Sequence, residues 1–130
     1  MEYSATAKYI RVSTRKLRLI RDSIMGLSPK EAIDVLGFTP KNAARPMSLV
    51  IRSAVANAIQ KGAKEQNLVL KEVIVMGGPM MKRFHAVSRG MAHEYKKRMT
   101  HVRVTLSEKQ IEVKPESKPE VKKESKKETA

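Results

Sequence analysis

A group of basic side chains in the C-terminal half of the chain could bind the phosphates of a polyanion. From Lys82 to Arg103 the sequence has seven Lys or Arg residues and only one acidic residue, Glu94. All three histidines of the chain also fall in this segment. Lysine and arginine neutralise phosphates, and histidine can bond to a phosphate or stack on a base. The segment therefore predicts contact with a nucleic acid.

A second row of cations is predicted on a helix near the N-terminus. Ser13 is a suitable N-cap for a helix that runs to about residue 25, and Gly26 is a suitable C-terminal stop. Arginines recur at three-residue spacing along one side of this helix, and a lysine flanks its apolar stripe. The four cations are Arg15, Lys16, Arg18 and Arg21. The helix has four basic residues and a single acidic one. This charge asymmetry favours a face that contacts phosphates, and a merely solvated face is the alternative.

The same residue types give little support for catalysis or metal binding. The sequence contains no P-loop, GxGxxG, HExxH or GxSxG motif, and nothing places its Ser, His and Asp residues together. The absence of cysteine excludes disulfides and thiolate metal sites. His85, His93 and His101 are eight residues apart, and we expect them to be scattered along two strands rather than to converge. We therefore predict no enzyme activity, no cofactor and no metal site.

The basic segment is held between two predicted strands, residues 68–76 and 101–106. The 24 residues between them, Gly77–Thr100, far exceed the two to five that a tight hairpin needs. We refer to residues 77–100 as the arm. Gly77-Gly78-Pro79 and Gly90 are expected bends in it. As an extended ribbon of about 11 residues per side, the arm would reach roughly 35 Å, and a merely basic, mobile loop is the alternative.

The arm carries apolar side chains among its charges. Such side chains indicate that the arm is buried inside folded RNA and does not stay in free solvent. These side chains are Met80, Met81, Phe84 and Met91. The triplet Lys96-Lys97-Arg98 is a phosphate-binding cluster of low specificity. In the strand that follows, Val102, Val104 and Leu106 alternate with His101, Arg103 and Thr105, which predicts one core face and one wet or RNA-facing side.

Before the arm, the pattern predicts one weak strand and two further helices. The strand covers residues 2–10, with Tyr3, Ala5, Ala7 and Tyr9 at period two. Ser28-Pro29-Lys30-Glu31 is a capping box, and the short helix after it is expected to bury Ala32, Val35 and Leu36 and to stop at Gly37.

The third helix has the best helical periodicity in the chain. Thr39-Pro40 suggests its start, and Gly62 its end, but Pro46 predicts either a kink or a later start. The expected apolar stripe consists of Ala43, Ala44, Met47, Val50, Ile51, Ala54, Val55, Ala58 and Ile59.

The overall composition places the positive charge on the folded part of the chain. The 130 residues carry a net charge of +14, of which residues 1–106 account for +13 and residues 107–130 for +1. We predict a globular domain over residues 1–108, including the arm, and a disordered Lys/Glu-rich tail over 109–130. No long apolar run and no signal-peptide core are visible, so we expect a cytoplasmic protein without a membrane partner.

Taken together and in register, several segments resemble the bacterial large-subunit ribosomal protein twenty-two family over roughly residues 5–108. Three lie before the arm: Ser13-Thr14-Arg15-Lys16-Leu17-Arg18, Phe38-Thr39-Pro40-Lys41-Asn42-Ala43-Ala44 and Ser53-Ala54-Val55-Ala56-Asn57-Ala58. The others are Gly78-Pro79, Met81-Lys82-Arg83-Phe84, Gly90, Lys97-Arg98 and His101 followed by alternating valines. The chain differs from the family pattern where His85-Ala86-Val87 replaces Arg-Pro-Arg and Met91 replaces arginine.

The resemblance implies an α+β fold in which three helices pack on a three-stranded antiparallel sheet with a long projecting β-hairpin arm. It implies a structural constituent of the large ribosomal subunit that aids assembly, with its globular part near the outer end of the peptide exit tunnel. The arm would thread several domains of large-subunit rRNA. Its tip would line the tunnel wall beside ribosomal protein four of the large subunit and meet the nascent peptide. No homo-oligomer is expected.

The resemblance also assigns roles to individual residues. It implies body contacts to rRNA from Arg15, Lys16 and Arg18, and contacts at the arm from Lys82, Arg83, Arg89, Lys97, Arg98 and His101. Charge adds Arg21, Lys96 and Arg103 to the expected RNA-binding set. The expected tunnel-lining tip is Phe84, His85, Ala86, Val87, Ser88, Arg89, Gly90 and Met91.

Two other classes of function compete with this interpretation. A DNA-architectural protein could wrap a duplex with a β-arm, but it would need a self-complementary dimer interface and usually paired arms. A basic module for membranes or acidic proteins would need an amphipathic helix with large aromatic anchors, and the sequence has none.

Overall fold

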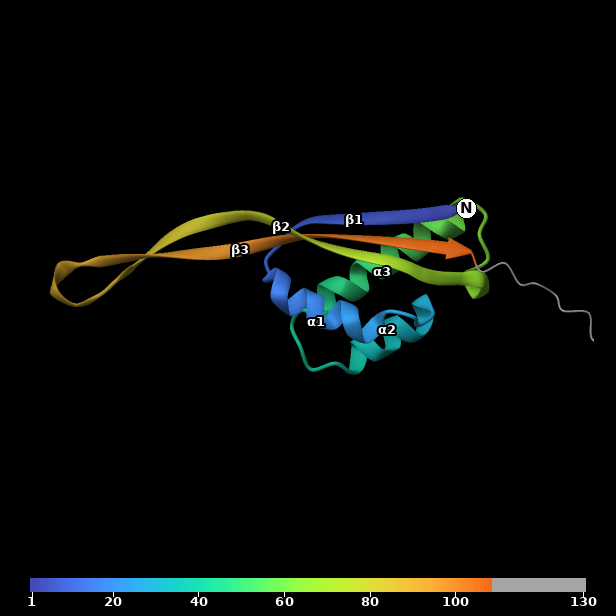
Figure 1. Ribbon diagram of the computed structural model, residues 1–130, viewed down its shortest axis with the longest axis horizontal. Helices are drawn as coiled ribbons and strands as arrows, with labels where there is room; N and C mark the ends of the chain where they lie inside the picture. Colours follow the sequence, from blue (N-terminus) through green and yellow to red (C-terminus); the bar gives the residue numbers. More distant parts are fainter. Residues whose placement is uncertain (109–130) are drawn as a thin grey trace, which may run out of the picture.

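The computed structural model describes residues 1–108, so the tail predicted over 109–130 lies outside the described residues. Three helices and three strands make up the described part of the chain (Figure 1). In chain order they are β1 (Glu2–Ile10), α1 (Thr14–Ile24), α2 (Pro29–Phe38), α3 (Ala44–Gln60), β2 (Leu68–Ala86) and β3 (Ala92–Glu108). Short 3-10 turns occupy Glu65–Asn67 and Ser88–Gly90.

The sheet is antiparallel throughout, and β3 is its central strand in the order β1-β3-β2. Leu106 lies opposite Tyr3 of β1 and Leu70 of β2, and Val104 lies opposite Ala5 and Val73. Residues directly opposite each other point to the same side of a sheet. The pairing therefore collects the apolar side chains of all three strands on one face, and it confirms the predicted α+β fold.

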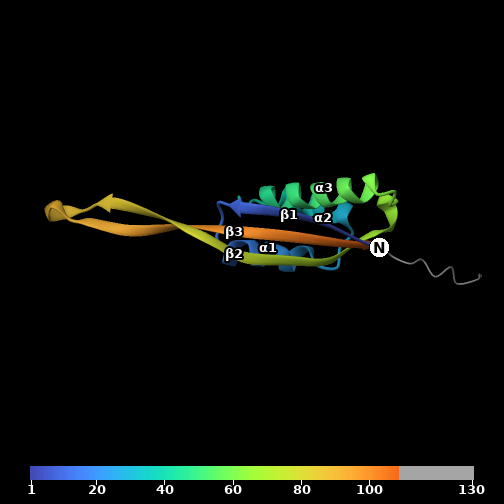
Figure 2. The ribbon, with the colours of Figure 1, turned by 90° about the horizontal axis from the view of Figure 1, so that it is seen from above.

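The three helices cover that apolar face and leave the other face open (Figures 1 and 2). Helix α3 runs beside β1 and β3, α1 lies against β2, and α2 packs on α3. Alanines of α3 that are fully buried, such as Ala54 and Ala58, allow the helix to approach the sheet closely. None of the helices in residues 1–108 is both long enough and apolar enough to span a lipid bilayer.

The start of α2 confirms the predicted capping box. The Ser28 backbone N–H donates to Glu31 Oε2 at 3.0 Å, and Glu31 N–H donates to Ser28 Oγ at 3.4 Å. Hydrogen bonding with the Ser28 backbone and with the Ser28 side chain lowers the pKa of Glu31, and the backbone has the larger effect. The predicted inner face was wrong at Val35, which is 40% exposed, because Ala32 and Leu36 take the inward positions and Val35 is turned by about 100° from Leu36. The helix also continues through Gly37 to Phe38.

Helix α3 begins at Ala44 and not after Thr39-Pro40. Pro46 is its third residue, within the first turn, where a backbone N–H has no partner in the helix anyway. The later start that Pro46 predicted is therefore confirmed. At the other end the expected burial of Ile59 was wrong: it is 50% exposed, because Ala58 takes the inward position and the next residue is turned by about 100°.

The predicted alternation of the first strand holds only to Ala7. Tyr3 and Ala5 are buried, but Tyr9 is 58% exposed and has a positive φ of 59°. The β1–β3 register shifts between Ala7 and Ile10, just before the last pair of the strand, Ile10 with Thr100. This irregularity turns Tyr9 out of the core and directs the chain toward α1.

Candidate nucleic-acid interface

The arm is a two-stranded ribbon that continues β2 and β3 beyond the helices (Figures 1 and 2). The last pair between β1 and β3 is Ile10 with Thr100. Past it, β2 and β3 pair only with each other, from Met80 with Arg98 to Ala86 with Ala92. The predicted extended ribbon is therefore present, and no helix covers either of its faces (Figure 1).

The turn at the end of the arm depends on two consecutive left-handed residues. Arg89 has φ 59° and Gly90 has φ 66°, and the Val87 N–H donates to the Met91 carbonyl at 2.9 Å. Gly90 is the bend that the sequence predicted. Sequence reasoning missed the second bend, because arginine rarely adopts this conformation. The turn leaves the Arg89 side chain exposed at the end of the ribbon.

The base of the arm is irregular at the predicted Gly77-Gly78-Pro79, where the β2–β3 register shifts. A Cβ atom on Gly78 would lie 3.1 Å from the Met99 carbonyl oxygen and 3.2 Å from His101 Nε2. These separations are closer than ordinary van der Waals contact, so only glycine fits here without displacing its neighbours.

His101, an expected RNA contact, is tied into the base of the arm. Its Nδ1 accepts the backbone N–H of Tyr9 at 3.0 Å, and the two rings meet edge to face with centroids 4.8 Å apart. Beside it the fully buried Thr100 donates its hydroxyl to the Val12 carbonyl at 2.6 Å. These bonds join the arm to the segment between β1 and α1. Contact between His101 and RNA stays a prediction, and Nδ1 is already engaged within the protein.

The pairing register divides the basic side chains of the arm between its two faces. Cross-strand partners share a face, and neighbours along a strand alternate. One face carries the pairs Met80 with Arg98, Lys82 with Lys96 and Phe84 with Glu94. The other carries Met81 with Lys97, Arg83 with Tyr95 and His85 with His93. With the histidines neutral, each of these two sets has a net charge of +2, so both faces attract anions.

Like charges lie directly opposite each other within the arm. Lys82 is the register partner of Lys96, and such a pair destabilises a sheet. The Glu94 carboxylate lies 3.8 Å from Lys82 Nζ, but this exposed ion pair offsets little of the repulsion. A polyanion that contacted both lysines would remove the repulsion and stabilise the ribbon.

Two predictions about arm side chains have different outcomes. Phe84 is 71% exposed, and Met80 and Met91 are also exposed, as expected for residues that need an external partner. The expectation that the histidines are scattered was wrong for His85 and His93, which are register partners. Within residues 1–108 there is no group of three or more His, Cys, Asp or Glu side chains that could hold a metal ion.

The predicted body cations do not form one uniform row. Arg15, Lys16 and Arg18 are exposed on α1, whose first turn lies at the arm end of the body (Figure 1). Arg21 instead bonds the carboxylate of Asp22, with Nη2 2.7 Å from Oδ1. Arg103 lies on the open face of the sheet, where its Nε donates to Thr6 Oγ1 at 3.3 Å.

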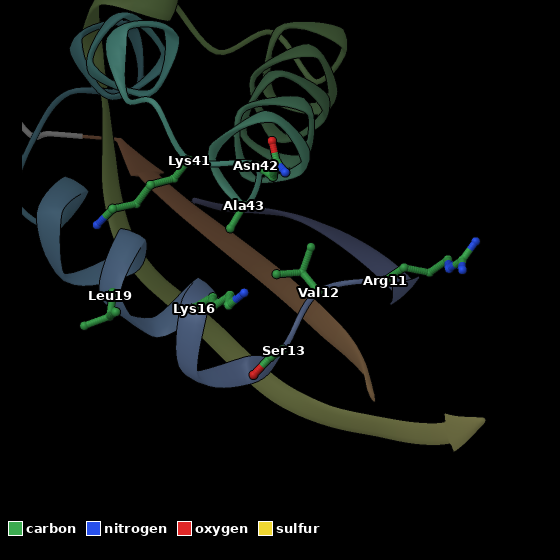
Figure 3. A pocket seen from close by; sticks show the side chains of 8 residues that line it. All are labelled: Arg11, Val12, Ser13, Lys16, Leu19, Lys41, Asn42 and Ala43. Atoms are coloured by element: carbon green, nitrogen blue, oxygen red, sulfur yellow. The ribbon is translucent and has the colours of Figure 1, made fainter. Parts of the chain in front are cut away.

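A cavity of about 520 Å³ lies beside the exposed cations of α1 (Figure 3). Its lining includes two cations that the sequence analysis did not predict as RNA contacts. Eight residues line it: Arg11, Val12, Ser13, Lys16, Leu19, Lys41, Asn42 and Ala43. Arg11 and Lys41 were missed because neither belongs to a periodic pattern. Each precedes the first residue of a helix by three positions, and this shared spacing could have indicated them.

Comparisons with known proteins agree with the predicted resemblance. A family model described as Ribosomal protein L22p/L17e matches residues 5–107. The chain is 44% identical over 110 residues to the large ribosomal subunit protein uL22 of Leptospira biflexa serovar Patoc, covering 83% of this chain and 95% of that protein. The protein of the same name from Syntrophus aciditrophicus is 44% identical over 110 residues, covering 84% and 100%. That from Thermotoga sp. (strain RQ2) is 44% identical over 113 residues, covering 86% and 71%.

Proposed function

Because the chain belongs to the ribosomal protein L22p/L17e family, we propose that its arm binds large-subunit rRNA and brings its tip to the wall of the peptide exit tunnel. Membership makes the chain a structural constituent of the bacterial large ribosomal subunit in the cytoplasm, and not an enzyme. In this role it aids assembly of the subunit.

The observation that carries the proposal is the presence of cations on both faces of a ribbon only two strands wide. A protein that lies on the surface of a nucleic acid needs positive charge on one side only. The arm has Lys82, Lys96 and Arg98 on one face and Arg83 and Lys97 on the other. A ribbon with this charge distribution suits a gap between RNA helices, where phosphates approach from both sides and counterions are released.

Further contacts follow from the position of the other cations. The exposed Arg15, Lys16 and Arg18 of α1 extend the basic surface from the arm base onto the body. The tip, residues 84–91, carries Arg89 and the exposed Phe84 and Met91, which can meet bases or a passing nascent peptide. The remaining proposed partners are several rRNA domains and neighbouring ribosomal proteins, including protein four at the tunnel constriction.

Shortening the arm tests the proposal directly. Removing residues 82–96 and joining the register partners Met81 and Lys97 through an Asn-Gly turn keeps the base of the hairpin but deletes its outer part. We expect the full chain to stay with large subunits through a high-salt wash, and the shortened chain to bind large-subunit rRNA at least about tenfold more weakly because it loses several phosphate contacts. Sedimentation with purified large subunits and an rRNA titration measure the two effects.

The deleted residues contribute nothing to the buried core, so the thermal unfolding of the shortened chain should match that of the full chain. If the full chain washed off the subunit, the proposed function would be wrong. If the shortened chain bound as tightly as the full chain, the outer part of the arm would not be the binding element.

A further inference from the structure

We propose that the cavity between α1 and the start of α3 receives one splayed-out nucleotide of the large-subunit rRNA. The inference rests on the proposed function, which brings rRNA against the neighbouring side of α1. It adds a nucleotide-binding site on the body to the contacts proposed for the arm.

Two stretches of the chain, residues 11–19 and 41–43, build the cavity (Figure 3). The chain after β1 supplies Arg11, Val12 and Ser13, α1 supplies two residues, and the turn before α3 supplies three. Figure 3 shows Val12, Lys16 and Ala43 pointing toward one another across the space. Its volume of about 520 Å³ lies within the range of roughly 300–1,000 Å³ that small-molecule sites occupy.

The cavity has apolar groups and hydrogen-bonding groups that a base needs. Val12, Leu19 and Ala43 provide an apolar surface for the face of a base. Asn42 lies at the rim, where Figure 3 shows its amide directed away from Val12 and Lys16, and this amide carries both donors and an acceptor for the edge of a base that projects past the rim. The Ser13 hydroxyl makes no capping hydrogen bond to α1 and points away from Val12 and Ala43 in Figure 3, so it is available at the rim to the backbone of the RNA.

The rim supplies charge for the phosphates on either side of such a base. Lys16 points into the space, while Arg11 and Lys41 extend away from it in opposite directions (Figure 3). Within residues 1–108 no acidic side chain lines the space. The three cations favour the phosphodiester of RNA over a segment of another ribosomal protein, and the cavity is continuous with the cationic side of α1.

Filling the cavity without changing its charge provides the test. Asn42→Trp and Leu19→Trp each place a bulky ring at an exposed position that lines it. Gln60→Trp is the matched control, because it puts the same ring at an exposed position of α3 away from the cavity. We expect both filled variants to bind large-subunit rRNA about tenfold more weakly, as the loss of one held base implies, and the control to bind as the unchanged chain does.

Ultraviolet cross-linking of the unchanged chain to large-subunit rRNA, followed by nuclease digestion and mass spectrometry, locates the contact. The expected product is a nucleotide attached to a peptide from residues 11–19 or 41–43. Filled variants that bind as tightly as Gln60→Trp would overturn the inference. So would a lysine-reactive cross-link from Lys16 or Lys41 to a neighbouring protein in assembled subunits in place of the nucleotide adduct.

The two proposals fail in different ways. If the unchanged chain did not bind large-subunit rRNA at all, the proposed function itself would fail. If the chain bound and only the cavity-filling variants were without effect, the arm would remain the rRNA-binding element and the cavity would not be a nucleotide site. Thermal unfolding of all three variants shows whether any loss of binding comes from loss of the fold.

Discussion

Replacing Lys96, Lys97 and Arg98 together with alanine is expected to weaken binding to large-subunit rRNA and to flatten its dependence on salt. Lys96 and Arg98 lie on one face of the arm and Lys97 lies on the other, so the change removes phosphate contacts from both sides. Each lost contact lowers the slope of log affinity against log salt concentration by about 0.7–0.9, so the triple change should lower it by about 2. Affinity titrations at several salt concentrations give this slope.

A control with the same loss of charge separates specific contacts from overall attraction. Lys30, Lys61 and Lys64 are exposed at the start of α2 and after α3, at the end of the body away from the arm (Figure 1). Alanine at these three positions should change the slope far less. A slope unchanged by the arm substitutions would show that the cluster is only solvated surface. A collapse of thermal stability would instead show that these side chains belong to the fold.

The largest expected effect on stability is that of Ile51→Ala. Ile51 is fully buried where α3 packs on the sheet, and truncating such a side chain typically costs about 2–5 kcal/mol through lost burial and a residual cavity. Ile59→Ala removes the same atoms from the same helix at a position that is 50% exposed. It should cost less than about 1 kcal/mol, partly because alanine is a better helix former than isoleucine.

Chemical denaturation of the two variants measures both free energies of unfolding. The comparison also tests the correction to the predicted stripe, because periodicity alone places both isoleucines in the core. Equal losses of stability would mean that the last turn of α3 is buried after all. A small loss at Ile51 would mean that the helix is not held against the sheet as described.

Features that depend on a few neighbouring residues could be predicted from the sequence. The capping box at Ser28 and Glu31 needs only the residues of one helical turn, and it is present. The alternation of Val102, Val104 and Leu106 predicted a strand with one buried face, and all three are fully buried. The resemblance supplied the arrangement of helices on the sheet, which local patterns leave open.

Features that depend on how distant segments meet could not be predicted. The exposure of Val35 depends on which side of α2 the rest of the fold covers, and hydrophobic spacing does not contain that information. The pairing of His85 with His93 depends on the turn at Arg89 and Gly90, because a shift of one residue in that turn would change every partner along the arm. The cavity beside Lys41 likewise exists only where the separate stretches 11–19 and 41–43 come together.

Amide hydrogen exchange of the full chain, free and bound to large-subunit rRNA, tests most directly whether the arm is the rRNA-binding element. A two-stranded ribbon without a core is marginally stable, so amides of residues 80–100 should exchange fast in the free protein while those of α3 exchange slowly. On binding rRNA, the arm amides should slow markedly and those of α3 should change little. Arm amides that are strongly protected in the free protein, or that still exchange fast in the complex, would contradict the account.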